Sequence, residues 1–292
     1  MWAGQMTTIR KILFPVDFSP CCNAMVPFVK RAAAMFSSKV TLLHVLEPST
    51  SGFELLTRPA PEAEEDQKTV ACAKLTAYLS SEFPVHKFPR LLVVGEAADR
   101  IAAVARERDF DLIVMPTHAG VFRRTLLGST TAKVLNDADC MVMTTQHAES
   151  ISPRQLEHRE WVCAIGLSAD SERVLSIASQ LAETAQANLS LIHAIPAAGH
   201  VPPVQLDLEE RVQSLEKQAA GERLRELQSA VGSHAKVNIA VGPTKDALTG
   251  MAHRLHADAL VIGRSSKPGA QGRLRDLTYA VVRDAPCPVI SV

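Results

Sequence analysis

Short apolar segments alternate with longer amphipathic segments along the whole chain. In the first half, strand-sized apolar segments cover residues 9–16, 40–46, 86–94, 112–115 and 140–144. Helical spacing of apolar residues predicts helices over residues 21–37, 62–81, 97–108 and 129–137. The apolar runs around Leu112 and Leu260 do not alternate with polar residues, which is typical of strands buried on both faces of a parallel sheet. Regular strand–helix alternation implies right-handed crossovers and therefore a doubly wound α/β sheet.

The second half of the chain repeats the pattern of the first half. Four segments match in the same order, namely 41–45 with 190–194, 94–95 with 241–242, 111–115 with 258–262, and 138–142 with 285–289. The histidines of the first match are 149 residues apart, and the other three matches have an offset of 147. Such ordered matches indicate a duplicated domain. We therefore expect two tandem Rossmann-like domains, each with a five-stranded parallel sheet, over residues 1–150 and 151–292.

The second half also contains a long amphipathic segment. Its apolar residues follow helical spacing, and we interpret them as one stripe packed against the core: Leu206, Leu208, Val212, Leu215, Ala219, Leu224 and Leu227.

The composition argues against two classes of partner, nucleic acids and membranes. The 292 residues include 31 Lys and Arg and 31 Asp and Glu, so the net charge is zero, which argues against a dedicated nucleic-acid binder. Aromatic residues make up only 4%, which argues against a base-stacking surface. The longest apolar runs are strand-sized and fall short of the roughly 20 residues that span a membrane. We expect neither a nucleic-acid nor a membrane partner.

The N-terminus and the cysteines bear on the compartment. Residues 1–10 contain no apolar core of a secretory signal. None of the six cysteines forms a C-x-x-C pair, so we expect reduced thiols and a cytoplasmic protein. Cys21 and Cys22 lie in a polar turn, which would leave them accessible.

Candidate chemistry gathers where the strands end. Ligands of open parallel sheets bind at the carboxyl ends of the strands. The first predicted strand ends at 15–17, the second at 44–45 and the fourth at 115–116. A loop with His118, Arg123 and Arg124 follows the fourth strand and closes on residues 128–130 at the start of a helix.

The segment Gly128-Ser129-Thr130 suits an anion. A helix N-terminus presents unpaired N–H groups and a partial positive charge, and glycine lets a phosphate approach the backbone. The structural alternative is an ordinary N-cap, because Ser and Thr are good caps. The combination with Asp17 and the loop arginines favours anion binding.

Several of these segments together resemble the universal stress protein family. They are Ile-Leu-Phe-Pro-Val-Asp-Phe-Ser at 12–19, Leu-Leu-His-Val at 42–45, and the segments 94–95, 111–115, 117–118 and 127–129. The resemblance covers the first copy from its first to its fifth strand. It covers the second copy more faintly, most clearly in Ala-Pro-Cys-Pro-Val at 285–289.

The resemblance implies a five-stranded parallel sheet with helices on both faces. It also implies ATP as the ligand, since many members bind ATP through a G-x2-G-x9-G-[ST] loop and members without the loop do not. Asp17 and Val45 would lie at the adenosine, Met115 and the loop at the ribose, and residues 128–130 at the phosphates. The candidate nucleotide-binding residues are therefore Pro15, Val16, Asp17, Val45, Met115, Pro116, His118, Arg123, Arg124, Gly128, Ser129 and Thr130.

Both copies depart from the family's loop. In the first, Pro116 replaces the first glycine and removes an N–H, and the loop is about one residue short. Arg123 and Arg124 could supply the missing charge. In the second copy, Gly166 stands in the place of Asp17, and Arg275-Asp276 stands in the place of the Gly-Ser pair. Because an aspartate repels phosphate, we expect that the second copy does not bind ATP.

The remaining histidines give little support for catalysis or metal binding. His253 and His256 lack the glutamate of a zinc-protease motif, so no metal site is expected. His44 and His193 end equivalent strands, where we expect them to pack or to form hydrogen bonds. The chain lacks a Walker lysine motif and a G-x-S-x-G motif, so no catalytic residue is assigned.

Three hypotheses of function follow from the sequence. The first is a stress-response regulator that binds ATP in its N-terminal domain and is recognised in that form by an unknown protein partner. The second is slow ATP hydrolysis by the same domain. The third is a nucleotide-independent scaffold that binds a protein or an apolar ligand. The sequence leaves open whether Mg²⁺ accompanies the nucleotide.

The duplication also bears on assembly. Family dimers commonly pair their last strands, and an exposed edge strand needs cover. We expect the segments 140–144 and 287–292 to pair the two domains about a pseudo-twofold axis, as an intramolecular pseudo-dimer. Further homodimerisation is left open.

Overall fold

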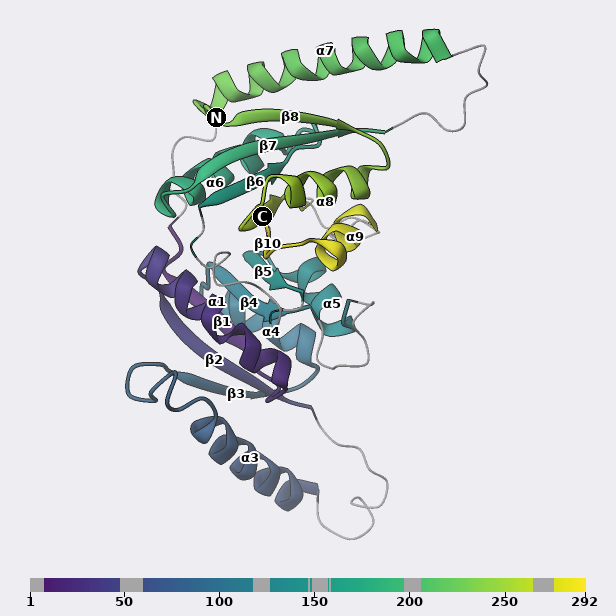
Figure 1. The fold of residues 1–292 in the computed structure, drawn as a ribbon. Helices are drawn as coiled ribbons and strands as arrows, with labels where there is room; N and C mark the ends of the chain where they lie inside the picture. Colours follow the sequence, from purple (N-terminus) through teal and green to yellow (C-terminus); the bar gives the residue numbers. More distant parts are fainter. Residues whose placement is uncertain are drawn as a thin grey trace. The chain divides into compact units, whose positions relative to one another are not determined.

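The chain forms two compact units, Thr8–Ser150 (domain 1) and Ile151–Val292 (domain 2). The structure is a computed structural model, and it describes residues 8–47, 60–117, 127–146, 148, 157, 159–196, 206–264 and 276–292. Both units are α/β, with strands and helices alternating along the chain (Figure 1).

Domain 1 is built on a parallel sheet with the strand order β3-β2-β1-β4-β5. Its strands are β1 (Lys11–Pro15), β2 (Lys39–Leu46), β3 (Arg90–Val94), β4 (Leu112–Pro116) and β5 (Met141–Thr145). Its helices are α1 (Pro20–Phe36), α3 (Ala60–Ala77), α4 (Ala97–Glu107) and α5 (Ser129–Asp137).

Domain 2 repeats this order as β8-β7-β6-β9-β10, again with parallel pairing. Its strands are β6 (Glu160–Ala164), β7 (Asn188–Ile195), β8 (Lys236–Val241), β9 (Ala259–Ile262) and β10 (Val289–Ser291). Its helices are α6 (Ser171–Thr184), α7 (Leu206–Val231), α8 (Thr244–Arg254) and α9 (Asp276–Asp284). The prediction of two tandem doubly wound domains is confirmed.

The helices cover both faces of each sheet. Right-handed crossovers place α1 and α3 on one face of the domain 1 sheet and α4 and α5 on the other. Contacts agree with this, because α4 packs against α5 in domain 1, while α6 packs against α7 and α8 against α9 in domain 2. The central strands β4 and β9 are buried along their whole length, as their unbroken apolar runs predict.

One aspartate in each domain ties the first strand to the fourth. Asp111 Oδ2 accepts hydrogen bonds from the backbone N–H groups of Arg10 and Lys11, at 2.8 and 2.9 Å. Asp258 Oδ2 accepts the same pair of bonds from Arg159 and Glu160, both at 2.8 Å. The repeat therefore extends from the sequence to individual hydrogen bonds.

Two sequence predictions about elements are wrong in part. The strand predicted over 86–94 begins only at Arg90, because Lys87 and Phe88 donate to the carbonyl of Pro84 in a turn and Pro89 has no N–H to donate. The stripe predicted along α7 faces the core only near the end of the helix, at Leu224 and Leu227, since Ala219 is exposed.

In the C-terminal half of α7, Ala220, Leu224 and Leu227 are buried. Val212 and Leu215, by contrast, are 45% and 67% exposed. The helix runs for 26 residues (Figure 1), and the domain leaves these two apolar side chains of its N-terminal half uncovered.

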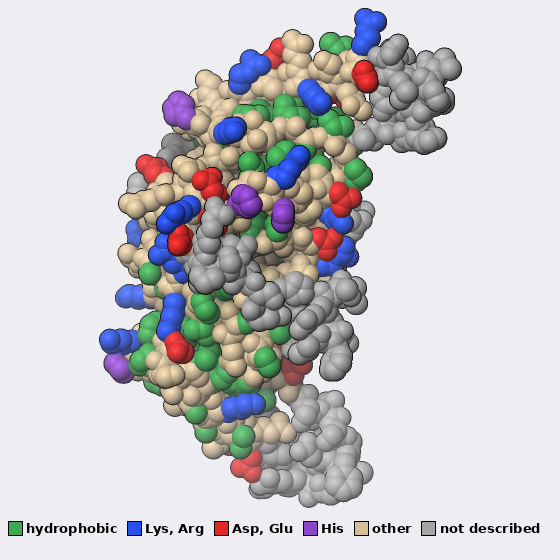
Figure 2. Space-filling view, in the orientation of Figure 1, with side chains coloured by type: hydrophobic (Ala, Val, Ile, Leu, Met, Phe, Trp, Pro, Cys, Tyr) green, Lys and Arg blue, Asp and Glu red, His purple; other side chains and the backbone are tan. Residues whose placement is uncertain are grey.

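Surface charge follows the neutral composition. The face drawn in Figure 2 shows Lys and Arg side chains interspersed with Asp and Glu side chains. Within the part of the chain that the structure describes, no helix is both long enough and apolar enough to cross a membrane.

Candidate functional site

The first strand of domain 1 ends in a buried turn followed by an exposed carboxylate. Pro15 and Val16 are buried, and the backbone N–H of Val16 donates to the carbonyl of Leu43 at 2.7 Å. His44 Nδ1 lies 2.8 Å from the carbonyl oxygen of Val16, so the ring nitrogen donates and fastens the strand end. Hydrogen bonding by this histidine confirms the sequence prediction. Asp17 follows and is exposed.

Two donors hold the Asp17 carboxylate beside the start of α1. Its Oδ1 accepts from the backbone N–H of Ser19 at 2.9 Å and from the Cys22 thiol at 3.0 Å. Ser19 caps α1, because its side chain accepts from the Cys22 backbone N–H. Burial and the negative charge of Asp17 raise the pKa of the Cys22 thiol. The carboxylate is therefore oriented by the helix start while it remains open to solvent.

The expectation that Cys22 is accessible is wrong. Cys22 lies in the first turn of α1, on the helix face that buries Met25 and Val29, and it is 2% exposed. Proline is compatible with the first helical position, because the N–H that it lacks would have no partner within the helix there.

Phe18 builds an aromatic cluster next to Asp17. Its φ of +65° turns the ring toward β2 and α3. The ring centroid lies 4.3 Å from that of His44 and 5.0 Å from that of Tyr78, and the Lys74 ammonium lies 4.3 Å from it. Burial raises the pKa of Tyr78, whose hydroxyl donates to Asn23 Oδ1. Sequence analysis missed Lys74 and Tyr78, because Lys74 on α3 and Tyr78 directly after it are distant in the sequence and no motif marks them.

The N-terminus of α5 is fastened to the carboxyl end of β4. The Gly128 N–H donates to the carbonyl of Thr117 at 2.8 Å, and Thr131 Oγ1 donates to the carbonyl of Pro116 at 3.0 Å. Gly128 is itself the N-cap residue, and no side chain caps the helix. Ser129 and Thr130 are therefore the first helical residues rather than the cap, so the ordinary N-cap alternative does not describe this helix.

The candidate residues within the described chain converge on one edge of the sheet. Val45 lies two residues beyond Leu43, which pairs with Pro15, so Val45 is level with Asp17. Leu13 pairs with Ile113, which brings Pro15 level with Met115. Met115 and Pro116 are buried, whereas Ser129 is exposed. His118, Arg123 and Arg124 lie outside the described residues.

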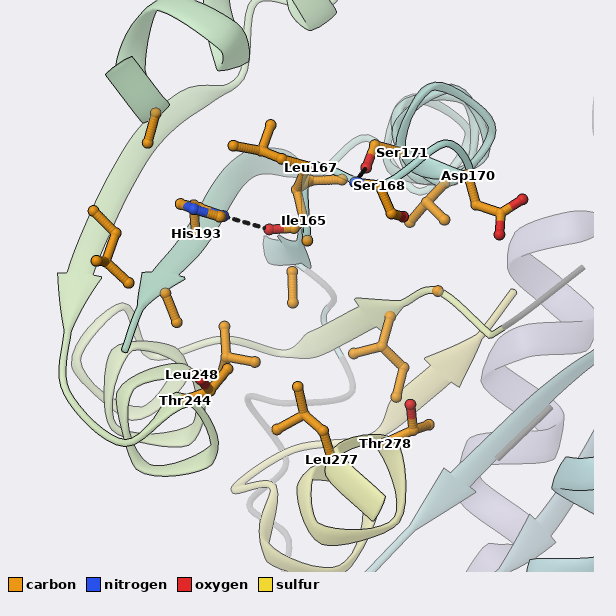
Figure 3. Close-up of a pocket in the computed structure, with 18 of the residues that line it drawn as sticks. Ile165, Leu167, Ser168, Asp170, Ser171, His193, Thr244, Leu248, Leu277 and Thr278 are labelled. Carbon is orange, nitrogen blue, oxygen red and sulfur yellow. Dashed lines mark hydrogen bonds between the residues drawn. The ribbon is translucent and has the colours of Figure 1, made fainter. Parts of the chain in front are cut away.

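Domain 2 has a pocket at the equivalent edge. It has a volume of about 800 Å³ and lies at the carboxyl ends of β6, β7 and β9, between these ends and the helices α6, α7, α8 and α9 (Figure 3). Gly166 lines it in the place of Asp17, and His193 Nδ1 donates to the carbonyl of Ile165 at 2.8 Å, as His44 does to Val16. Leu167 takes the place of Phe18 and shares its left-handed backbone, with a φ of +52°.

Among the residues that the structure describes, no group of three or more His, Cys, Asp or Glu side chains is arranged to hold a metal ion.

Known proteins resemble both the whole chain and half of it. Universal stress protein MJ0577 of Methanocaldococcus jannaschii is 24% identical over 157 residues, which is 48% of this chain and 97% of the relative. A universal stress protein from Archaeoglobus fulgidus has a similar structure over 98% of this chain and 96% of its own, with a TM-score of 0.68 at 16% identity. PA1789 from Pseudomonas aeruginosa, a protein of unknown function, has a similar structure over 98% of this chain and 93% of its own, with a TM-score of 0.66 at 19% identity.

Family membership rests on the sequence itself. The sequence profile of the universal stress protein family matches residues 8–146 and again residues 159–292. These two matches correspond to the two sheets described above. The chain therefore belongs to the universal stress protein family, and it carries two domains of that family in tandem.

Proposed function

We propose that domain 1 binds ATP at the carboxyl edge of its sheet and that the protein acts as a nucleotide-dependent regulator in a stress response. The observation that carries the proposal is the start of α5. This helix N-terminus carries no side-chain cap, and two hydrogen bonds hold it at the end of β4. Uncapped N–H groups at a helix N-terminus are suited to phosphate oxygens.

The other end of the site supplies the groups that a nucleoside needs. The Asp17 carboxylate has a fixed orientation and accepts hydrogen bonds, so it can also accept one from an amino or hydroxyl group of the nucleoside. Val45, half-buried and level with Asp17, offers an apolar surface to a base. Pro116 lacks an N–H, but the contact with the start of α5 uses its carbonyl, which accepts the hydrogen bond from Thr131 Oγ1. The proline is therefore compatible with this helix start.

Calorimetric titration of the full chain with ATP, with and without Mg²⁺, tests the proposal. We expect one site per chain. Gly128→Asp should weaken binding by about a hundredfold or more, because a carboxylate at the N-cap takes the N–H groups and repels the phosphates. Gly128 has a φ of −61°, which any residue can adopt, so the variant is expected to fold.

Two further variants test the phosphate end and the nucleoside end of the site separately. Gly128→Asn caps the same N–H groups without a charge and should weaken binding less than Gly128→Asp does. Asp17→Asn keeps an oxygen for Ser19 and Cys22 and should lose about tenfold in affinity, the scale of one hydrogen bond to a charged group. Two sites per chain, or full affinity in Gly128→Asp, would contradict the proposal.

A further inference from the structure

The pocket of domain 2 has the dimensions of a small-molecule site. Its volume of about 800 Å³ falls within the roughly 300–1,000 Å³ typical of such sites. It lies where ligands of doubly wound sheets bind, at the carboxyl ends of the strands. A nucleotide is a poor candidate for it, because Gly166 offers no carboxylate and α9 begins at Asp276.

The wall of the pocket is mainly apolar. Residues from seven elements and the β6–α6 turn contribute to it, and Figure 3 shows Ile165, Leu167, Leu248 and Leu277 around the cavity. The larger aliphatic side chains that line the pocket are Ile165, Leu167, Val174, Ile195, Leu248, Ile262, Leu277 and Val281. Such a wall gains free energy when an apolar ligand displaces water from it.

The two copies differ at the end of the first strand. In domain 1 the space beside the strand end holds the Asp17 side chain, and the Phe18 ring packs on His44 and Tyr78. In domain 2 a Cβ added to Gly166 would meet no atom within 4 Å, and Leu167 is smaller than phenylalanine. The pocket is thus open at the position where the other copy carries its carboxylate.

The charges around the pocket favour a neutral ligand. The charged residues that line it are Asp170, Glu216, Arg223 and Arg264, two of each sign. Asp170 lies at the rim, at the start of α6, and its carboxylate points away from the apolar side chains (Figure 3). A ligand with a net charge would lose its hydration without a compensating excess of opposite charge.

The imidazole of His193 can accept a hydrogen bond from a ligand. A backbone carbonyl only accepts hydrogen bonds, so the contact from His193 Nδ1 to the carbonyl of Ile165 fixes the proton on Nδ1. In the neutral ring this leaves Nε2 as an acceptor. His193 lines the pocket, and a ligand that carries a hydroxyl or amino group can donate to it.

We propose that domain 2 binds a neutral, mainly apolar small molecule that donates a hydrogen bond to His193. With ATP in domain 1 as proposed above, the two domains of one chain would bind ligands of different chemistry at equivalent edges of their sheets. This proposal does not depend on ATP binding by domain 1.

The test uses 1-aminoanthracene, a neutral aromatic amine whose fluorescence rises in an apolar environment. We expect saturable binding to the full chain, with the same affinity in the absence and in the presence of ATP. Gly166→Leu, which fills the pocket from an open position, should weaken binding at least tenfold. Leu277→Asp, at a 40% exposed position of the wall, should also weaken it.

Gly250→Leu is the matched control. Gly250 is exposed on α8, does not line the pocket, and has no atom within 4 Å of an added Cβ, so this variant should bind the probe as the wild type does. Circular dichroism and thermal unfolding report whether each variant is folded.

Three outcomes would overturn the proposal. The first is the absence of saturable binding by the wild type, which would favour the chain itself or a second copy as the occupant. The second is unchanged binding in both folded pocket variants. The third is displacement of the probe by ATP, which would place the probe in the nucleotide site of domain 1.

Discussion

Two glycines at the carboxyl edge of the domain 2 sheet have opposite surroundings. A Cβ on Gly263 would lie 2.7 Å from Val174 Cγ2, whereas one on Gly166 would meet no atom within 4 Å. We expect Gly263→Ala to lower the free energy of unfolding of domain 2 by about 1–3 kcal/mol, the usual cost of overpacking. Gly166→Ala should change it by less than about 0.5 kcal/mol. Urea unfolding followed by tryptophan fluorescence measures both.

The signal can be restricted to domain 2. The chain has two tryptophans, and Trp161 on β6 is 1% exposed, so a Trp2→Phe background leaves Trp161 as the only reporter. If the clash with Val174 causes the loss, Gly263→Ala should cost little once Val174→Ala has removed the opposing methyl groups. An equal cost in both backgrounds would show that the methyl contact is not the cause.

Residues at the candidate site differ in how far the sequence predicts them. His44 and His193 end equivalent strands, and their hydrogen bonding was predictable from that position. The burial of Cys22 was missed although its spacing from Met25 and Val29 places it on the apolar face of the predicted helix, because it was assigned to a polar turn. Lys74 approaches Phe18 only because α3 packs over β2 and β3, which is a tertiary contact that no local pattern encodes.

At the scale of elements, an aspartate before the fourth strand of each domain holds the start of the first strand. Asp258 is completely buried, whereas Asp111 is half-buried. Removing the acceptor leaves two backbone N–H groups without their partner. We expect Asp258→Ala to cost about 3 kcal/mol of domain 2 stability, and Asp111→Ala to cost domain 1 about 1–2 kcal/mol because water reaches its N–H groups more easily. Hydrogen exchange along β6 and β1 measures the two losses separately.

Asparagine at the same positions is the control. It keeps an oxygen for both N–H groups and removes only the charge, so Asp258→Asn should recover most of the stability that Asp258→Ala loses. A loss as large in Asp258→Asn would show that the negative charge, rather than the acceptor, holds β6 to β9.

Element boundaries were predictable where local patterns and packing agree. The central strands carry uninterrupted apolar runs, and the structure places them at β4 and β9. The start of β3 was not predicted, because Lys87 and Phe88, inside the strand predicted over 86–94, donate their N–H groups to the carbonyl of Pro84 in a turn. The exposed half of α7 was not predicted either, because helical periodicity marks an apolar face but not how much of it the domain covers.

At the scale of the whole molecule, the duplicated pattern predicts the two domains and their fold, and the family matches agree with it. The pocket of domain 2 was not predicted. Residues from seven elements and the β6–α6 turn line it, so the pocket is visible only once these elements are packed together. Sequence analysis predicted that domain 2 lacks a nucleotide site, and it gave no indication of the mainly apolar pocket there.

Nucleotide should therefore protect the two domains unequally. A ligand present at 100 times its dissociation constant stabilises the domain that binds it by about 2.7 kcal/mol. We expect ATP to slow hydrogen exchange in β1, β4 and the first turn of α5, and to leave exchange in β6 and β9 unchanged. Hydrogen exchange of the full chain with mass spectrometry resolves these segments in a single experiment.

The control for this asymmetry is Gly128→Asp, because it removes the phosphate site and leaves domain 2 untouched. ATP should have no effect on either domain of this variant. Equal protection of β6 and β9 in the wild type would mean either that domain 2 also binds the nucleotide or that the two domains open as one unit. A Gly166→Leu chain distinguishes these cases. Filling the pocket would abolish protection that comes from a nucleotide bound there, and it would preserve protection that is transmitted from domain 1.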